Sequence, residues 1–509
     1  MKVDSRSITP PTNPILTLGA AEIARRIAGG EVSSREAASA FIDRIEAVDP
    51  QLNAVCWPMF DAARDAAARA DEAQARGEKL GSLHGVPITI KECFHFAGTP
   101  STMGLTALRN QMDASDGPLV ARLKAAGAVV LGQTNVPQLM ILHETDNPVY
   151  GRTNNPHDLS RTPGGSSGGE GAIIAAGGSP LGLGSDLGGS IRIPAHFCGI
   201  AGLKPTTFRL SKQGAVENLR GMESLHFQPG PMARQVEDLE LAMGVMCGQF
   251  DAATEEQESP VPWRESRNID VSKLRIGVFE TDDYAHPHAA VRRAVEQAAT
   301  ALREAGATVE PFDPPDAATA MALYFGIVGA DGAADLRRLT QGSTVDHRVA
   351  AIIRLGATPR WLRPALAAML RAKGKGQLAD LVAAAGPRSA DGYWRLTHQA
   401  KRYVRDFLAR LNQANFDAIL CPPHAHPAFP HGQGGPGMMI AASYAFVMNL
   451  LGIPCGVVPV TTVQPDEAHS GEAGLPIGVQ IAAQHWREDI VLAVMGEVQR
   501  RSEAAQAAR

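Results

Sequence analysis

Two glycine-rich segments, residues 161–170 and 184–190, constrain the fold of this chain more than any other feature. They read RTPGGSSGGE and GSDLGGS, and they place Ser166 and Ser190 among glycines. Glycine lets a backbone approach a ligand closely because it has no side chain. The two segments therefore predict tight turns at which serine hydroxyls and backbone N–H groups converge on one place.

The glycine-rich segments have several interpretations. A flexible linker is excluded because the residues that follow each segment, 172–176 and 191–194, are apolar and indicate burial. A phosphate-binding loop would end in Gly-Lys followed by Ser or Thr, whereas Gly169 precedes Glu170, whose charge would repel an anion. The two serines remain as candidate nucleophiles, with backbone N–H groups to stabilise an oxyanion.

Two kinds of base are candidates for activating such a serine. Residues 164–168 match the Gly-x-Ser-x-Gly turn of α/β-hydrolases, which needs a strand before the serine and a histidine base. Residues 157–163 are polar and contain a proline, which argues against that strand. Candidate histidines downstream are His226, His424, His426 and His431. The other base is Lys91, which follows the strand-like run 86–90, because burial lowers the pKa of a lysine toward neutrality.

Length, charge and cysteine spacing exclude several classes of protein. The 509 residues suffice for one large or two ordinary domains. The net charge is −5 without basic blocks, so no nucleic-acid partner is expected. The six cysteines lack metal-binding spacing, and residues 1–14 lack the apolar core of a signal peptide, so we expect a cytoplasmic protein. No apolar run of about 20 residues predicts a membrane span.

Strand and helix patterns alternate over much of the chain. A capping box at Ser33 starts a helix that is expected to end at Pro50. The strand before Lys91 is followed by a helix from Pro118 and a strand at 128–131. Later strands are expected at residues 275–279, 417–420, 456–460 and 478–481. Strand–helix–strand order predicts an α/β fold with a largely parallel sheet and helices on its faces.

Residues 315–415 differ from the rest of the chain. They are rich in alanine and in helical patterns, with amphipathic segments at 361–370 and 393–411. They predict either a helical cap over a site or ordinary outer helices. No repeat or long linker marks a boundary, so we expect a single domain over residues 1–509.

Three motifs and their spacing resemble those of the amidase signature family. They are GVPITIK, GGSSGGEG and GSDLGGSIRIP at residues 85–91, 164–171 and 184–194. Residues 132–138, GQTNVPQ, resemble the fatty-acid-amide-hydrolase branch, which includes enzymes that cleave anilides and urethanes. Further matches lie at residues 201–206, 230–234 and 474–480, so the resemblance spans nearly the whole chain, with the signature core at about 80–240.

This resemblance implies a fold and a catalytic set. The implied fold is α/β, with a large mixed, mostly parallel sheet covered by helices on both faces. Carried over residue by residue, Ser190 is the nucleophile, Ser166 is a proton bridge with a cis peptide bond, and Lys91 is the general base and acid. The implied oxyanion hole consists of the backbone N–H groups of Leu187, Gly188, Gly189 and Ser190.

The resemblance also implies residues around this set. Ser167 is expected to support the site from behind, and Asp186 and Arg192 are expected to brace the oxyanion loop as a structural ion pair. The substrate pocket is expected to contain Met140, Ile141, Tyr324 and Phe325, with Arg209 at its entrance. Core packing is the alternative role for each apolar residue.

The function that the resemblance implies is hydrolysis of amide C–N bonds through an acyl-enzyme. Aryl amides and carbamates (urethanes) are expected substrates, with esterase side activity. The rival is an amidase-type subunit of a glutamine-dependent amidotransferase, against which Gln133 argues. The family needs no metal or cofactor, so His424 and His426, in a proline-rich loop, are expected to be structural or surface residues. We expect a small-molecule substrate and a monomer or homodimer.

Overall fold

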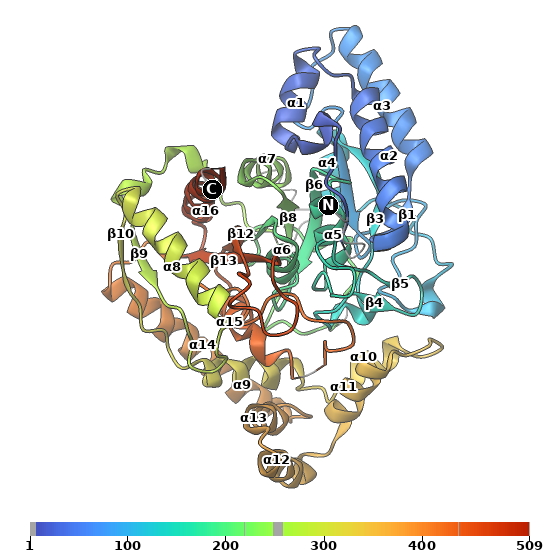
Figure 1. Cartoon of the computed structure of the whole chain (residues 1–509). Helices are drawn as coiled ribbons and strands as arrows, with labels where there is room; N and C mark the ends of the chain where they lie inside the picture. The colour runs from blue at the N-terminus through green and yellow to red at the C-terminus, as the bar shows by residue number, and fades with distance from the viewer. Residues whose placement is uncertain (1–6, 218, 248–257, 436, 508–509) are drawn as a thin grey trace.

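One continuous sheet of eleven strands organises the protein (Figure 1). The structure is a computed structural model and describes residues 7–217, 219–247, 258–435 and 437–507. The strand order is β1-β3-β2-β6-β8-β7-β12-β13-β11-β9-β10. The strands are β1 Val55–Pro58, β2 Pro87–Lys91, β3 Val129–Thr134, β6 Leu181–Asp186, β7 Ala201–Lys204, β8 Gln228–Ala233, β9 Arg275–Val278, β10 Thr308–Pro311, β11 Ala418–Cys421, β12 Cys455–Thr462 and β13 Pro476–Ala483. A separate ribbon joins β4 Asp146–Asn147 to β5 Gly151–Arg152.

The pairing in the sheet is mixed, as expected. Strands β3, β2 and β6 pair in parallel, and so do β11, β9 and β10. The pairs β1-β3, β6-β8, β8-β7, β7-β12, β12-β13 and β13-β11 are antiparallel. Antiparallel pairs therefore outnumber the parallel pairs that strand–helix–strand order favours. The reason is that loops, not helices, connect β7 to β8 and β12 to β13, so the chain returns beside itself.

Helices cover both faces of the sheet, as glycines on two adjacent strands show. On β7, an added Cβ at Gly202 would lie 2.7 Å from Ile191, just before α6. On β12, a Cβ at Gly456 would lie 2.3 Å from Met495 of α16. Gly456 pairs with Leu203, the neighbour of Gly202, and successive residues of a strand point to opposite faces. Helices α6 and α16 thus pack on opposite faces, which confirms the predicted layers.

The helices are bounded as follows: α1 Ala20–Ala28, α2 Ser34–Leu52, α3 Phe60–Ala75, α4 Pro118–Ala125, α5 Gly168–Ala175, α6 Arg192–Cys198, α7 Val236–Met246, α8 Ala289–Glu304, α9 Ala317–Val328, α10 Ala334–Leu339, α11 His347–Ala357, α12 Arg363–Ala372, α13 Gly376–Ala384, α14 Ala390–Gln413, α15 Ser443–Leu451 and α16 Glu488–Ala507. The predicted start of α2 is confirmed, because Ser33 accepts the N–H of Glu36 at 3.0 Å. Its predicted end is wrong: Pro50 lies within the helix, which ends where Asn53 adopts a left-handed conformation with φ of 53°. None of the described helices is long and apolar enough to cross a membrane.

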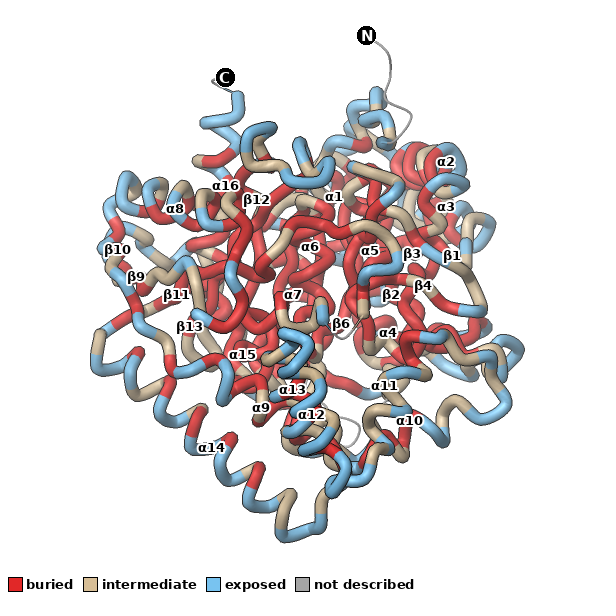
Figure 2. Tube along the Cα trace, turned by 60° about the horizontal axis from the view of Figure 1, so that its bottom comes forward, coloured by how far each residue is buried: buried red, intermediate tan, exposed pale blue. Residues whose placement is uncertain are grey.

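Residues 315–415 contain the helices α9–α14 and contribute no strand to the sheet. Helices α10–α13 gather at one edge of the molecule, at the bottom of the view in Figure 1. Burial concentrates instead in the central strands and in α5, α6 and α15, while α12 and α14 carry long exposed stretches (Figure 2). The amphipathic segments predicted in this region correspond to α12 and α14.

Candidate active site

Lys91 ends β2 inside the protein, with its side chain fully buried. Its Nζ lies 2.7 Å from the hydroxyl of Ser166 and 2.9 Å from that of Ser185, and it donates to the Ser185 carbonyl at 3.4 Å. No carboxylate forms an ion pair with it in the part of the chain that the structure describes. Burial lowers the pKa of this amine below its ordinary value, so the neutral form, which accepts a proton, is easier to reach than in an exposed lysine.

Ser166 lies in a turn that only glycine neighbours can form. The peptide bond between Gly165 and Ser166 is cis, as the resemblance implied. Gly164 has φ of 90°, and a Cβ on Gly165 would lie 2.5 Å from the Leu142 carbonyl oxygen. Ser167 ties this turn to the second segment, because its N–H donates to the Ser190 carbonyl at 3.0 Å and its hydroxyl donates to the Ser185 carbonyl at 3.3 Å. The two glycine-rich segments therefore form one unit.

The loop from Asp186 to Arg192 connects β6 to α6 and is braced by a buried ion pair. Arg192 donates to the Asp186 carboxylate through Nε at 3.0 Å and Nη2 at 2.9 Å, with both side chains fully buried. The same carboxylate accepts the N–H groups of Gly189 at 2.8 Å and Ile191 at 3.1 Å. Burial alone would raise the pKa of Asp186, but Arg192 and Asn449 hold it well below its ordinary value. The ion pair thus has the structural geometry expected of it.

The N–H groups of this loop differ in their availability. Those of Leu187, Gly188 and Ser190 have no hydrogen-bond partner within the described residues. Gly189 departs from the prediction, because its N–H already donates to Asp186. The reason is the bend after β6, which turns this N–H back toward the carboxylate. Three of the four predicted oxyanion donors are therefore free in this conformation.

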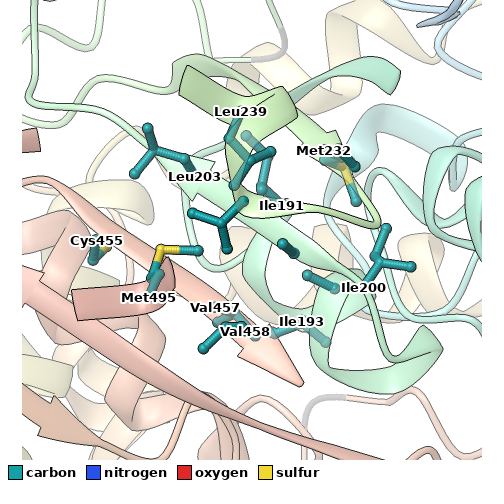
Figure 3. Close-up of a cluster of buried hydrophobic side chains, with 14 of the residues drawn as sticks. Ile191, Ile193, Ile200, Leu203, Met232, Leu239, Cys455, Val457, Val458 and Met495 are labelled. Atoms are coloured by element: carbon teal, nitrogen blue, oxygen red, sulfur yellow. The ribbon is translucent and has the colours of Figure 1, made fainter. Parts of the chain in front are cut away.

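The loop is anchored by the apolar residues that follow it. Ile191 and Ile193, at the start of α6, point into a cluster with Ile200, Met232 and Val458 (Figure 3). All five side chains are fully or almost fully buried. The apolar run after Ser190, which excluded a linker, therefore fixes the serine against the centre of the sheet.

A cavity of about 200 Å³ lies against the two serines. Ser166, Ser190, Leu187 and Gly188 line it together with many apolar side chains. Helices α9, α10, α11 and α13 supply much of this apolar wall, through Phe325, Val328, Leu336, Ile352, Leu355, Leu378, Leu381 and Val382. Of the predicted pocket residues, Met140, Ile141, Tyr324 and Phe325 line the cavity.

Arg209 does not lie at the cavity, contrary to the prediction. Its guanidinium is 1% exposed and pairs with Glu488 at 2.8 Å. The rings of Trp263 and Trp486 lie 5.9 and 5.0 Å from it. A buried guanidinium is costly without a charged partner, and Glu488 at the start of α16 supplies the carboxylate.

The alternative of a histidine base finds no support in the geometry. None of the four downstream histidines lines the cavity among the residues that the structure describes. His424 is fully buried in its loop with its ring edge against Phe197, which matches the structural role expected of it. The described residues contain no group of three or more His, Cys, Asp or Glu side chains arranged to hold a metal. The basic side chain at the serines is therefore that of Lys91.

Sequence reasoning missed several polar residues at the site. Ser185, which contacts Lys91, lies near the end of β6, which pairs with β2, so the order of the parallel strands is the signal that would have found it. His143 also lines the cavity, and burial lowers its pKa to about 4, so its imidazole is neutral. Glu170 accepts the hydroxyls of Thr89 and Thr134, and burial raises its pKa to about 8, so the charge expected in this loop is largely absent at neutral pH.

Comparison with known proteins places this site in a family. A family model described as Amidase matches residues 36–492. Fatty-acid amide hydrolase 1 of Sus scrofa is 36% identical over 509 residues, which cover 96% of this chain and 86% of that protein. A glutamyl-tRNA(Gln) amidotransferase subunit of Streptomyces avermitilis is 32% identical over 492 residues, 93% of each chain. A solved structure of a bacterial aryl acylamidase of the amidase signature family has a TM-score of 0.78 and 26% identity, covering 97% of this chain and 98% of that one. The chain therefore belongs to the amidase signature family.

Proposed function

We propose that this chain hydrolyses amide C–N bonds through an acyl-enzyme formed on Ser190. The observation that carries the proposal is the 2.7 Å contact between the buried Lys91 amine and the Ser166 hydroxyl, in a cavity that Ser190 also lines. No hydrogen bond joins the two serine hydroxyls within the described residues. Catalytic hydrogen bonds are often long before substrate binds, and the relay requires this one to form in the complex.

The first half of the reaction forms the acyl-enzyme. Ser190 Oγ attacks the carbonyl carbon, while its proton passes to Ser166 and the proton of Ser166 passes to neutral Lys91. The carbonyl oxygen becomes an oxyanion that the free N–H groups of Leu187, Gly188 and Ser190 stabilise. The C–N bond then breaks as Lys91 returns the proton through Ser166 to the leaving nitrogen, because an amine leaves only when protonated.

The second half of the reaction releases the acid. Water occupies the place of the departed amine and gives one proton to the same relay as its oxygen attacks the ester carbonyl. A second tetrahedral oxyanion collapses, the bond to Ser190 breaks, and the relay returns the proton to Ser190 Oγ. The net reaction consumes one amide and one water and produces one carboxylic acid and one amine, with no cofactor.

The ion pair behind the oxyanion loop gives a prediction about stability and activity. Arg192→Met leaves Asp186 buried without its partner, so we expect the free energy of unfolding to fall by about 3–5 kcal/mol and kcat to fall as the loop loses its brace. Arg209→Met is the matched control, because it unpairs Glu488 away from the cavity. A similar loss of stability with unchanged kcat per folded molecule is expected there. Denaturant titration and kinetics on both variants provide the measurement, and equal kcat in both would contradict the bracing role.

The apolar lining of the cavity favours apolar substrates, and we propose that residues 315–415 act as a cap whose helices supply much of this lining. Asp331 is the one Asp, Glu, Lys or Arg among the described lining residues, and its carboxylate already accepts the N–H groups of Ala333 and Asp335. Apolar acyl chains and aryl groups bury surface there at about 25 cal/mol per Å². The names of the relatives, a fatty-acid amide hydrolase and an aryl acylamidase, support both groups. Carbamates present the same carbonyl and leaving amine, so we include aryl carbamates, with esters as side substrates.

A substrate panel tests this proposal. We expect kcat/KM to rise with acyl length by about fourfold per methylene until the cavity is filled, since each buried CH₂ contributes about 0.8 kcal/mol. Anilides and aryl carbamates are expected to be cleaved, and acetamide poorly. The matched probes are an anilide, a carbamate and an ester with the same aryl group. Cleavage of the ester alone would refute both the amide and the carbamate activity.

The amidotransferase subunit is the second candidate, because the Streptomyces avermitilis relative matches almost the full length of the chain. Glutamine carries an ammonium and a carboxylate on its α-carbon. Among the described residues of the cavity wall, no Lys or Arg is present to bind that carboxylate. We therefore expect no ammonia release from glutamine, and a measured release that depends on a partner chain would favour the amidotransferase instead.

A further inference from the structure

Two side chains from outside the loop 186–192 contact its carbonyl groups. The Tyr324 hydroxyl, on α9, donates to the Leu187 carbonyl at 2.9 Å. His143 Nε2 lies 3.2 Å from the Gly188 carbonyl oxygen, and this nitrogen carries the proton because a carbonyl only accepts. Nothing in the three signature motifs indicates either contact. Each one bears on a peptide unit whose N–H group belongs to the predicted oxyanion hole.

The two peptide units are held to different extents. The Gly188 carbonyl and the Gly189 N–H belong to one planar unit, which His143 holds at the carbonyl and Asp186 holds at the N–H. The Leu187 carbonyl and the Gly188 N–H belong to the preceding unit. That unit is held at its carbonyl by Tyr324, while its N–H has no partner within the described residues.

A planar trans peptide points its C=O and N–H in opposite directions. The bond Leu187–Gly188 is trans, since the cis bond among the described residues is the one before Ser166. Pulling the Leu187 carbonyl toward Tyr324 therefore directs the free Gly188 N–H the opposite way. A hydrogen bond at the carbonyl also polarises the peptide and strengthens its N–H as a donor.

Tyr324 is held tightly in this position. Its ring packs against those of Phe325 and Phe446, with centroids 5.4 and 4.7 Å away, and α9 packs against α15 (Figure 1). A Cβ on Gly188 would lie 2.4 Å from the Phe446 ring and 3.1 Å from the Tyr324 hydroxyl, so the peptide fits closely against both. Burial raises the pKa of Tyr324 far above its ordinary value, so the hydroxyl keeps its proton and remains a donor.

We propose that Tyr324 is a positioning residue, which aims the Gly188 N–H at the oxyanion through the Leu187 carbonyl. The proposal rests on the proposed amide hydrolysis at Ser190. It assigns to the helical cap a contribution to the chemical step, in addition to its contribution to the cavity wall.

The test is Tyr324→Phe, which removes one oxygen and keeps the ring in the cavity wall. Loss of a direct oxyanion donor costs about 10²–10³ in rate, and we expect misdirecting one to cost about 10–10²-fold in kcat, with KM within about twofold. The matched control is Tyr403→Phe on α14, whose buried hydroxyl donates to the Pro315 carbonyl at 3.1 Å away from the cavity. That variant is expected to keep wild-type kcat. Rates are divided by the concentration of reactive Ser190, measured by active-site titration, so that unfolded molecules do not lower the apparent kcat.

A second measurement separates positioning from packing. An alkyl trifluoromethyl ketone forms an anionic tetrahedral adduct with a serine, whereas an alkyl alcohol of equal length only fills the cavity. Tyr324→Phe is expected to weaken the ketone by the same factor as kcat and to leave the alcohol unchanged. Equal kcat and ketone affinity in Tyr324→Phe and wild type would overturn the proposal while leaving the hydrolase intact. A wild-type protein that neither cleaves amides nor binds the ketone would overturn the proposed function and this inference together.

Discussion

Replacing Ser190 by alanine is expected to lower kcat for every amide substrate by at least about 10⁴-fold. The substitution removes the atom that attacks the carbonyl, and the loss of a nucleophile in a serine hydrolase typically costs about 10⁶ in kcat. Substrate binding is expected to persist, because the apolar cavity wall is untouched. Steady-state kinetics and mass spectrometry of the acylated protein provide the measurement, with the adduct expected on Ser190 in the wild type and absent from the variant.

The controls for this prediction separate the two serines of the glycine-rich segments. Ser166→Ala is also expected to be severely impaired, but it keeps the nucleophile and should still acylate slowly on Ser190. Ser179→Ala removes an equally buried hydroxyl, which donates to the Leu181 carbonyl at 2.8 Å outside the site, and is expected to keep wild-type kcat. A stable acyl adduct on Ser166 in the Ser190→Ala variant would restore the nucleophile-elbow interpretation of residues 164–168.

Replacing Lys91 by methionine is expected to cause the second large loss of activity. General acid–base catalysis contributes about 10²–10⁴-fold, and we expect amide hydrolysis to fall by about that factor. Ester hydrolysis is expected to fall less, because an alkoxide leaves more readily than an unprotonated amine. Lys204→Met is the matched control, since Lys204 is as deeply buried but donates to the Pro205 carbonyl at 2.8 Å, whereas Lys91 contacts the hydroxyls of Ser166 and Ser185.

The pH dependence of kcat/KM provides an independent test of the role of Lys91. Lys91 acts as a base only when it is unprotonated, so kcat/KM is expected to rise with pH through its pKa and then reach a plateau. Burial lowers that pKa, so the midpoint should lie below the ordinary lysine value of 10.5. Lys91→Met should lack this rising limb. If the variant kept the limb, the titrating group would be a different residue, and the lysine relay would be wrong.

The fold and the positions of the three proposed catalytic residues could be predicted, because contiguous motifs carry the resemblance to the family. Lys91 follows a short apolar strand, and the glycines around Ser166 leave a backbone path that other residues could not follow. Both features depend on residues that are contiguous in the sequence. The direction of the central strands was harder to predict, since β12 and β13 read as ordinary strands and only the loop between them makes the pair antiparallel.

The polar contacts around the site escaped prediction because they join distant parts of the chain. Tyr324 and Leu187 are 137 positions apart, and only the packing of α9 brings them together. The prediction for Arg209 was wrong for a related reason. A charged residue that follows a motif was expected at the cavity entrance, but Arg209 is buried in an ion pair with Glu488, 279 positions later. A side chain's partner depends on tertiary packing, which the pattern of one segment does not contain.

The residues at the site and much of the cavity wall come from different segments of the chain, and this has a consequence for evolution. Lys91, Ser166 and Ser190 come from the first part of the chain, whereas residues 324–385 supply much of the cavity wall and no strand. Substitutions, insertions or deletions in the later segment would change which substrates fit the cavity, while Lys91, Ser166 and Ser190 would stay in place. Tyr324 would limit that freedom, because it lines the cavity and also donates to the Leu187 carbonyl. Under our proposal, its replacement is expected to change substrate choice and turnover together.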